Sequence, residues 1–236
     1  MLGLARRSDE AEWMDDASVD YATFPGCLQD LARVNRRSLG YRPTLAFLEG
    51  LRRAGRLDLG RPVEVLDVGS GYGDLLRAVA RWGARNGVAL RLTGLDLNPW
   101  AARAAAKATP GDVPVRWVTG DLFDHEGGAD VILSSLFAHH LPDDGVVRFL
   151  QWMEARARVG WFVNDLHRHP VPAYGFGPLA TLLRMHPFVR HDGPASFRRA
   201  FVALDWRRLL AEAGVPEGAA RVARAAPFRL CVGRAR

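Results

Sequence analysis

The chain has 236 residues, 48% hydrophobic and 25% charged, which is enough to bury one core of ordinary size. Its formal charge is +6, but the arginines are scattered in pairs among acidic residues without a basic block, and this disfavours a nucleic-acid-binding protein. No apolar run approaches the roughly 20 residues of a membrane span, and the charged start lacks the apolar block of a signal peptide. We therefore expect a cytoplasmic protein.

The cysteines give no sign of a metal centre. Cys27 and Cys231 are isolated, and neither is part of a C-x-x-C motif. We expect two free, buried thiols and no metal site.

Two helices are predicted before the first strand. Residues 1–16 are polar and are expected to be frayed, and apolar residues then recur at helical spacing over 25–37 and 41–54. These helices could pack on the outside of a sheet or cover a ligand site. In the second case the candidate ligand contacts are Asn35, Arg36 and Arg42.

A glycine-rich turn organises the rest of the chain. Residues 65–68 read as a buried strand, Gly69-Ser70-Gly71-Tyr72-Gly73 follows, and a helix is predicted over 74–86. Glycines admit positive φ and let a ligand approach the main chain, and the helix N-terminus offers N–H groups. The G-x-G-x-G spacing is not the G-x-G-x-x-G of dinucleotide sites. A nucleotide-like ligand and an ordinary strand-to-helix turn both remain open.

Acidic residues follow the next two predicted strands. The strand 89–96 ends at Asp96, whose two oxygens could accept hydrogen bonds from adjacent ribose hydroxyls; the alternative is a helix cap or loop acid. A helix is predicted over 100–108. The strand 113–119 is followed by Asp121, which could bind the exocyclic amine of a purine while Leu122 packs on the ring.

Two further strands complete an alternating pattern. The strand 129–136 leads to His139 and His140, Asp143 or Asp144 is expected to cap the next helix, and 159–166 is the fifth strand. Five strands alternating with helices predict an α/β, doubly wound parallel sheet with ligands at the carboxyl ends of its strands. That edge holds the glycine turn and, after the later strands, these side chains: Asp96, Asp121, His139 and Asp165.

At this point the chain resembles the class I S-adenosylmethionine-dependent methyltransferases over residues 60–166. The resemblance is carried by Leu66-Asp67-Val68-Gly69-Ser70-Gly71-Tyr72-Gly73, Asp96, Gly120-Asp121 and the segment 134–141. It implies a Rossmann-like, mainly parallel seven-stranded sheet and S-adenosylmethionine as cofactor. The turn would hold the amino-acid end of the cofactor, Asp96 the ribose diol and Asp121 the adenine amine, while Asp67 orients the turn. The expected cofactor contacts are Asp67, Gly69, Ser70, Gly71, Gly73, Asp96, Leu97, Asp121, Leu122, Ser134 and Arg42.

The remaining residues suggest a single domain with caps. We expect residues 1–58 to form an N-terminal helical cap on a core of 59–236, and the aromatic-rich insert at about 167–204, with a helix over 179–185, to cap the substrate. An amphipathic segment covers 206–213. The last strands are predicted at 220–225 and 229–232, and the family implies that the terminal one is antiparallel.

The chemistry of a sulfonium methyl group determines which side chains are candidates for a catalytic role. In-line transfer needs the acceptor held about 3 Å from the methyl carbon, away from water, and an alcohol or phenol benefits from a base such as histidine. The candidates are His139, favoured by its place after the fourth strand, and His140, His167 and His191, each of which could instead be structural. Asp165 could orient a histidine or touch the substrate. Arg168 and Arg190 could bind an acidic group or lie on the surface.

These observations predict a small-molecule methyltransferase, monomeric or homodimeric, that acts on the oxygen of a phenolic, quinol-like or polyketide-type metabolite. The alternatives are a nitrogen or carbon acceptor, or an RNA-binding or catalytically silent methyltransferase-like protein. Ser134-Ser135-Leu136-Phe137 stands where amino-methylating nucleic-acid and protein-glutamine enzymes carry an Asn-Pro-Pro-Tyr-type segment, which disfavours those classes.

Overall fold

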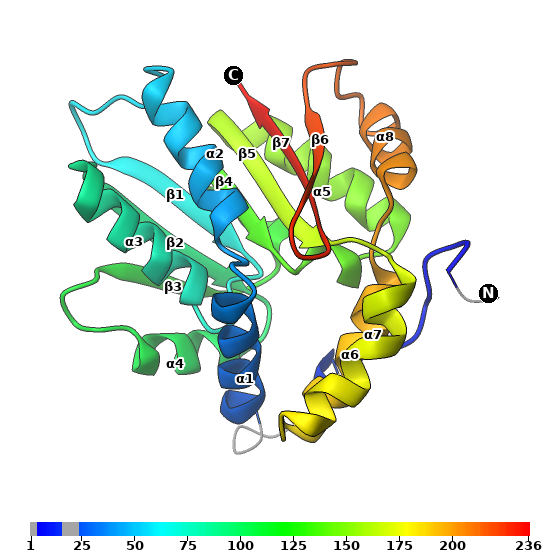
Figure 1. Cartoon of the computed structure of the whole chain (residues 1–236). Coiled ribbons are helices and arrows are strands. Elements are labelled where there is room, and N and C mark those ends of the chain that lie inside the picture. The colour runs from blue at the N-terminus through cyan, green and yellow to red at the C-terminus, as the bar shows by residue number, and fades with distance from the viewer. Residues whose placement is uncertain (1–3, 16–23) are drawn as a thin grey trace.

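The computed structural model describes residues 4–15 and 24–236 and contains one seven-stranded sheet with helices on both faces (Figure 1). The strands are β1 Val63–Val68, β2 Leu90–Asp96, β3 Val115–Thr119, β4 Ala129–Ser135, β5 Ala157–Leu166, β6 Arg221–Ala225 and β7 Arg229–Ala235. The α-helices are α1 Phe24–Arg37, α2 Arg42–Arg53, α3 Asp74–Asn86, α4 Pro99–Ala108, α5 Asp143–Arg156, α6 Pro170–Leu182, α7 Pro187–Arg199 and α8 Ala203–Glu212. Short 3₁₀ turns are η1 Trp13–Asp15, η2 Leu122–Asp124 and η3 Ala138–His140.

The sheet has the order β3-β2-β1-β4-β5-β7-β6, and β7 runs antiparallel to both of its neighbours while the other pairings are parallel. The predicted doubly wound α/β sheet and its antiparallel terminal strand are therefore confirmed. The order reverses between β1 and β4, which is where such sheets open a crevice for ligands.

Each face of the sheet has its own apolar core. On one face α5 and α8 contribute Phe149 and Trp206, which pack with Trp161 of β5, and all three are fully buried. On the other face Leu48 of α2 and Leu76 of α3 are fully buried against the sheet. Burying one such leucine contributes about 1.5–3 kcal/mol. The segment predicted as a helix over 41–54 thus covers the sheet.

Helices α1, α6 and α7 extend beyond the carboxyl edge of the parallel strands (Figure 1). The amide of His186, at the start of α7, donates to Asp30 of α1 (2.8 Å), and the thiol of Cys27 lies 3.0 Å from Nδ1 of the same histidine. The helix predicted over 179–185 was placed wrongly: α6 runs through Pro178 and α7 through Pro194. Prolines inside both helices hide them from a propensity-based prediction. None of the helices in the described ranges is long and apolar enough to cross a membrane.

Residues 4–15 pack along the same edge, so the expectation that 1–16 would fray is wrong for this part; residues 1–3 and 16 lie outside the described ranges. The guanidinium of Arg7 pairs with Asp143 (2.6 Å) and donates to the carbonyls of Leu141 and Arg199 (both 2.8 Å). Asp143 does not cap α5 as predicted. Pro142 is the N-cap and Asp143 is the first helical residue. The carboxylate of Asp143 binds Arg7 and Arg208 instead.

Candidate active site

The glycine turn is built from three left-handed residues, with φ of +68° at Gly69, +48° at Gly71 and +71° at Gly73. Aromatic side chains cover two of them. An added Cβ would lie 2.6 Å from the Phe137 ring at Gly69 and 2.2 Å from the Trp117 ring at Gly73, whereas nothing lies within 4 Å at Gly71. The missing Cβ atoms of Gly69 and Gly73 therefore make room for protein, and only Gly71 leaves open space for a ligand.

Asp96 ends β2 and holds this turn. One carboxylate oxygen accepts a hydrogen bond from the Gly71 amide (2.8 Å) and the other from the Asn98 amide (2.9 Å). Burial raises the pKa of Asp96, while the two amides and the nearby His140 act in the opposite direction. Each oxygen keeps a further lone pair, so the carboxylate can still accept from a hydroxyl of a ligand.

Polar atoms are left unsatisfied at the point where the strand order reverses. Oδ1 of Asp67 on β1 and Oγ of Ser134 on β4 are buried and have no hydrogen-bond partner among the described residues. Burial, helped by Asp74 and Asp96, raises the pKa of Asp67 well above its usual range. Buried polar atoms are rarely unpaired in native proteins, so both atoms favour a polar ligand or bound water here.

The other predicted cofactor contacts lie along the same edge in different environments. Leu97, directly after Asp96, is 71% exposed, whereas Leu122 is buried in the core. Asp121 is exposed. Its carboxylate caps η2 by accepting a hydrogen bond from the amide of Phe123 (2.8 Å). Ser70 is buried in the turn, and Arg42 is exposed at the start of α2.

His139 and Asp165 form a buried pair at the carboxyl end of β5. Nδ1 of His139 lies 2.6 Å from one oxygen of Asp165, and the His139 amide donates to the other oxygen (3.0 Å). Burial raises the pKa of Asp165, but its interactions with His139 outweigh this and lower the pKa to about 2. Two contacts to one carboxylate fix the imidazole in position and leave Nε2 directed away from Asp165.

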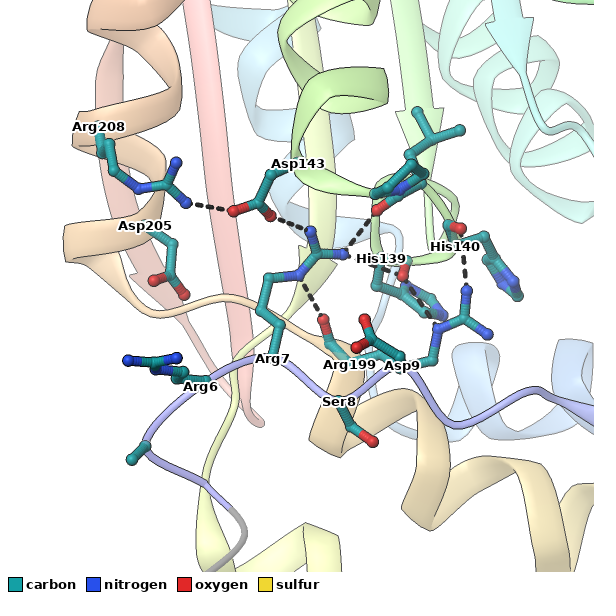
Figure 2. A pocket seen from close by; sticks show the side chains of 13 residues that line it. Arg6, Arg7, Ser8, Asp9, His139, His140, Asp143, Arg199, Asp205 and Arg208 are labelled. Atoms are coloured by element: carbon teal, nitrogen blue, oxygen red, sulfur yellow. Dashed lines mark hydrogen bonds and ion pairs between the residues drawn. The ribbon is translucent and has the colours of Figure 1, made fainter.

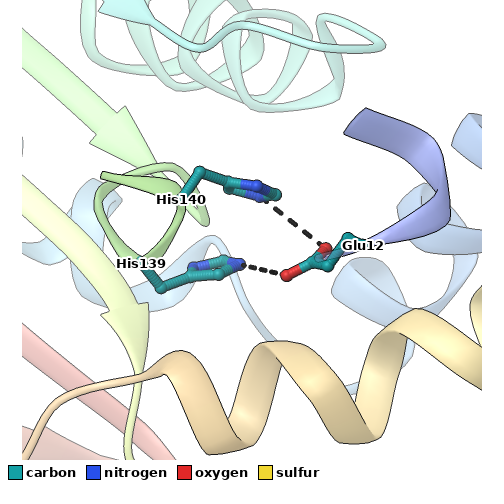
Figure 3. Close-up of side chains that lie close together, drawn as sticks. All are labelled: Glu12, His139 and His140. Atoms are coloured by element: carbon teal, nitrogen blue, oxygen red, sulfur yellow. Dashed lines mark ion pairs between the residues drawn. The ribbon is translucent and has the colours of Figure 1, made fainter. Parts of the chain in front are cut away.

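Glu12 completes a cluster with both histidines (Figure 3). Its carboxylate oxygens lie 3.7 Å from Nε2 of His139 and 3.9 Å from Nε2 of His140. Glu12 belongs to the polar segment that was expected to fray, and no motif or spacing in the sequence marks it. It joins the site through contacts between residues far apart in the chain.

The other two predicted histidines lie elsewhere. His167 lines a second cavity of about 300 Å³ with His169 and Arg224, and burial followed by Arg224 lowers its pKa. His191 stacks on Trp13, with ring centroids 3.8 Å apart, and its Nδ1 lies 2.8 Å from Asp192. The structure thus brings together His139, His140 and Asp165, whereas His167 lines the second cavity and His191 contacts Trp13, the residue that follows Glu12.

A cavity of about 630 Å³ adjoins the two histidines (Figure 2). Its lining is strongly polar, with arginines at 6, 7, 199 and 208 and aspartates at 9, 143 and 205. Arg199 donates to the carbonyls of His139 (3.2 Å) and His140 (2.9 Å), so it supports η3 from the cavity side. Arg168, in contrast, is buried and binds Asp205 (3.0 Å), so it is not a surface arginine.

Comparisons with known proteins agree with this geometry. Residues 65–173 match the family model of a methyltransferase domain. The ribosomal protein L11 methyltransferase of Geobacter sulfurreducens is 37% identical over 106 residues, which are 42% of this chain but only 34% of the relative, so the match spans about a third of that protein.

Solved structures of methyltransferases share the fold at low sequence identity. The plantazolicin methyltransferase BpumL, crystallised with S-adenosylhomocysteine, superposes with a TM-score of 0.62 at 14% identity over 89% of each chain. The magnesium protoporphyrin IX methyltransferase of Synechocystis PCC 6803 gives 0.58 at 16% identity, covering 94% of this chain and 90% of that one. Human N-acetylserotonin methyltransferase gives 0.61 at 14% identity over 92% of this chain and 56% of that one. Residues 65–173 of this chain thus match a methyltransferase domain, and the chain as a whole shares the fold of solved methyltransferases.

Proposed function

We propose that the protein transfers the methyl group of S-adenosylmethionine to a hydroxyl oxygen of a small molecule. One observation carries the proposal: the turn held by Asp96 and the pair of His139 and Asp165 lie at the same edge of the sheet. Asp96 ends β2 and Asp165 lies next to the end of β5, and both strands run in the same direction in one sheet.

The cofactor supplies an electrophilic methyl group, and the residues at the edge fit its parts. The open space at Gly71 and the unpaired oxygens of Asp67 and Ser134 suit its polar amino-acid end, and Asp96 suits the ribose diol. Leu97 rather than the buried Leu122 offers an exposed apolar surface to the adenine ring, and the exposed Asp121 is the proposed partner of its amine. Arg42 remains a candidate contact at the start of α2.

The transfer is an in-line displacement. A lone pair of the acceptor oxygen forms the new C–O bond, the C–S bond breaks with its electron pair staying on sulfur, and the hydroxyl proton is released. The products are the methyl ether, S-adenosylhomocysteine and a proton. A hydroxyl must lose its proton to react well, and we infer that His139, which Asp165 fixes, takes up that proton.

The elements that extend beyond the carboxyl edge of the sheet are proposed to cap the substrate. The segment 4–15 and helices α1, α6 and α7 extend beyond the edge that carries the site (Figure 1). Covering this edge would keep water from the reacting atoms. The relatives of known structure include enzymes named for plantazolicin, magnesium protoporphyrin IX and N-acetylserotonin, which supports a small-molecule acceptor.

Calorimetric titration with S-adenosylhomocysteine tests the cofactor half of the proposal. We expect binding by the wild type and an affinity at least about tenfold weaker in Asp96→Asn, because the amide presents one acceptor oxygen in place of two. Asp124→Asn, a change in an exposed acid after β3, should bind like the wild type. Absence of wild-type binding at millimolar concentration would refute the assignment.

Product analysis tests the acceptor. Incubation with labelled cofactor and a panel of phenols, quinols, amines and carbon acids, followed by mass and NMR analysis, should place the label on oxygen. A label on nitrogen or carbon would keep the enzyme class and overturn the oxygen assignment.

A further inference from the structure

Glu12, His139 and His140 form a compact group of potential metal ligands, which we call the Glu12 cluster (Figure 3). One ligand atom from each residue can be chosen so that all lie within 4.8 Å of one another, and the two Nε2-to-carboxylate distances are 3.7 and 3.9 Å. Ligands at 2.0–2.1 Å from a tetrahedral zinc ion are about 3.4 Å apart. All three pairs lie within 4.8 Å, so shifts of between a few tenths of an ångström and about 1.4 Å would let the three share one cation.

The carboxylate of Glu12 points to a missing partner. Glu12 is only 6% exposed, and its Oε1 atom, which faces His139, has no hydrogen-bond partner among the described residues. A buried carboxylate without a donor or a metal is costly. A cation between the three side chains would satisfy this oxygen.

Asp165 prepares His139 for the role of a ligand. Its carboxylate binds Nδ1 at 2.6 Å and so leaves Nε2, on the other side of the ring, to face Glu12. A carboxylate behind a ligating histidine fixes the ring and strengthens its basicity, as in many zinc sites.

We propose that the Glu12 cluster binds one divalent transition-metal cation. Two imidazoles and one carboxylate suit zinc or iron(II) and disfavour magnesium, which prefers oxygen ligands. Three protein ligands leave a coordination position open. From the isolated cysteines we expected no metal site, so the proposed site differs from the prediction made from the sequence.

The role of the cation rests on the proposed function. The acceptor hydroxyl would bind at the open position, where the positive charge lowers its pKa and the proton leaves to water. The acceptor oxygen would keep a lone pair for the methyl carbon. In this arrangement His139 and His140 act as ligands, and no free imidazole is needed as the base.

Titration of the metal-free full chain, made without a histidine tag, with Co²⁺ tests the site. We expect one equivalent to bind with visible d–d absorption bands and to be displaced by Zn²⁺ but not by millimolar Mg²⁺. Glu12→Gln and His140→Gln should each weaken Co²⁺ binding at least about tenfold. Glu10→Gln is the matched control, because this acid lies in the same segment but pairs with Arg198.

Each outcome decides the proposal. Stoichiometric binding that is weakened in both cluster variants and kept in Glu10→Gln supports it, and so does an anomalous-scattering peak between the three side chains. No stoichiometric binding by the wild type, or binding unaffected by either cluster variant, overturns it and leaves Glu12 as an ion-pair partner of the histidines. If Glu12→Gln fails to fold, His140→Gln decides, since that ring is partly exposed.

The metal experiment is independent of the cofactor experiment. Binding of S-adenosylhomocysteine by the metal-free protein would leave the proposed function standing even when Co²⁺ does not bind. Failure of cofactor binding would refute the proposed function but not the cation site.

Discussion

The indole of Trp117 occupies the space that a side chain at Gly73 would need. A Cβ atom at Gly73 would lie 2.2 Å from the ring, and one at Gly94, the β2 partner of Trp117 in the sheet, would lie 2.5 Å from it. The indole from β3 therefore spans β2 and reaches the first turn of α3. The packing of Trp117 from a neighbouring strand, together with the positive φ that glycine permits, fixes the conformation of the glycine turn.

Replacing Gly73 with alanine should destabilise the fold. The new methyl group would clash with Trp117 and would also force a non-glycine residue into the left-handed region, at φ +71°. We expect a loss of roughly 2–4 kcal/mol in the free energy of unfolding, measured by urea denaturation.

Gly71→Ala is the matched control for this substitution. It has the same type of backbone cost at φ +48° but no atom within 4 Å, so we expect a loss of only about 1 kcal/mol together with weaker cofactor binding. Equal destabilisation by the two alanines would show that the indole contributes nothing to the choice of glycine.

Asp165 should matter for turnover more than for cofactor binding. In Asp165→Asn the amide no longer offers two charged oxygens to the ring and amide of His139, so the ring loses its fixed orientation. We expect turnover to fall at least about tenfold while the affinity for S-adenosylhomocysteine stays within about twofold. The ¹⁵N shifts of His139 should report a changed tautomer. An unchanged tautomer with full turnover would remove Asp165 from the positioning role.

An ion-pair network at the opposite end of β4 should make stability depend on pH. The Asp130 carboxylate accepts two hydrogen bonds from Arg61 (both 2.8 Å) and others from the Glu64 amide and Arg158 (both 2.9 Å). Burial favours the protonated form, but these bonds outweigh it and hold the pKa of Asp130 well below its usual range. The stabilisation is therefore complete above the unfolded-state pKa of about 4 and is lost progressively as the pH falls below it.

Asp130→Asn tests this dependence. We expect it to lower the free energy of unfolding by roughly 2–4 kcal/mol at pH 7, and the difference from the wild type should shrink as the pH falls below about 4. Asp58→Asn, which removes an exposed partner of Arg61, should change stability by less than about 0.5 kcal/mol. A difference that stays constant between pH 7 and pH 3 would contradict the assignment.

Both cysteines should resist thiol reagents in the folded protein. Burial, followed by Asp192, raises the pKa of Cys27 to about 11, and burial raises that of Cys231 to about 12. Because the thiolate is the reactive form, neither should react measurably with a disulfide reagent at pH 7.5 until urea unfolds the chain. Rapid reaction of one thiol in the native state would show that its surroundings open.

The repeating part of the fold could be predicted from sequence because its signals are local. Strands β1 to β5 are apolar runs bounded by turn residues, and the turn at Gly69 to Gly73 and the acid Asp96 stand at fixed places in that pattern. Structure places Asp96 against the turn as expected. Its role toward the cofactor stays a prediction.

The helix bounds within the 167–204 insert and the Glu12 cluster could not be predicted because their determinants are tertiary contacts. Helices α6 and α7 contain prolines, and their ends are set partly by the side chains of His169 and His186, which accept from the amides of the first turn. Glu12 lies in a polar segment that is held by partners more than a hundred residues away. Periodicity carries no information about such contacts.

The anchoring of Arg7 has a consequence for how the molecule assembles. Its partners in the 139–143 region and at Arg199 lie 132 to 192 residues later in the chain, so these contacts can form only when η3, the start of α5 and the end of α7 are in place. Glu12 lies in the same segment, residues 4–15. A chain in which residues 4–15 are not docked would therefore keep both histidines but lack a complete Glu12 cluster.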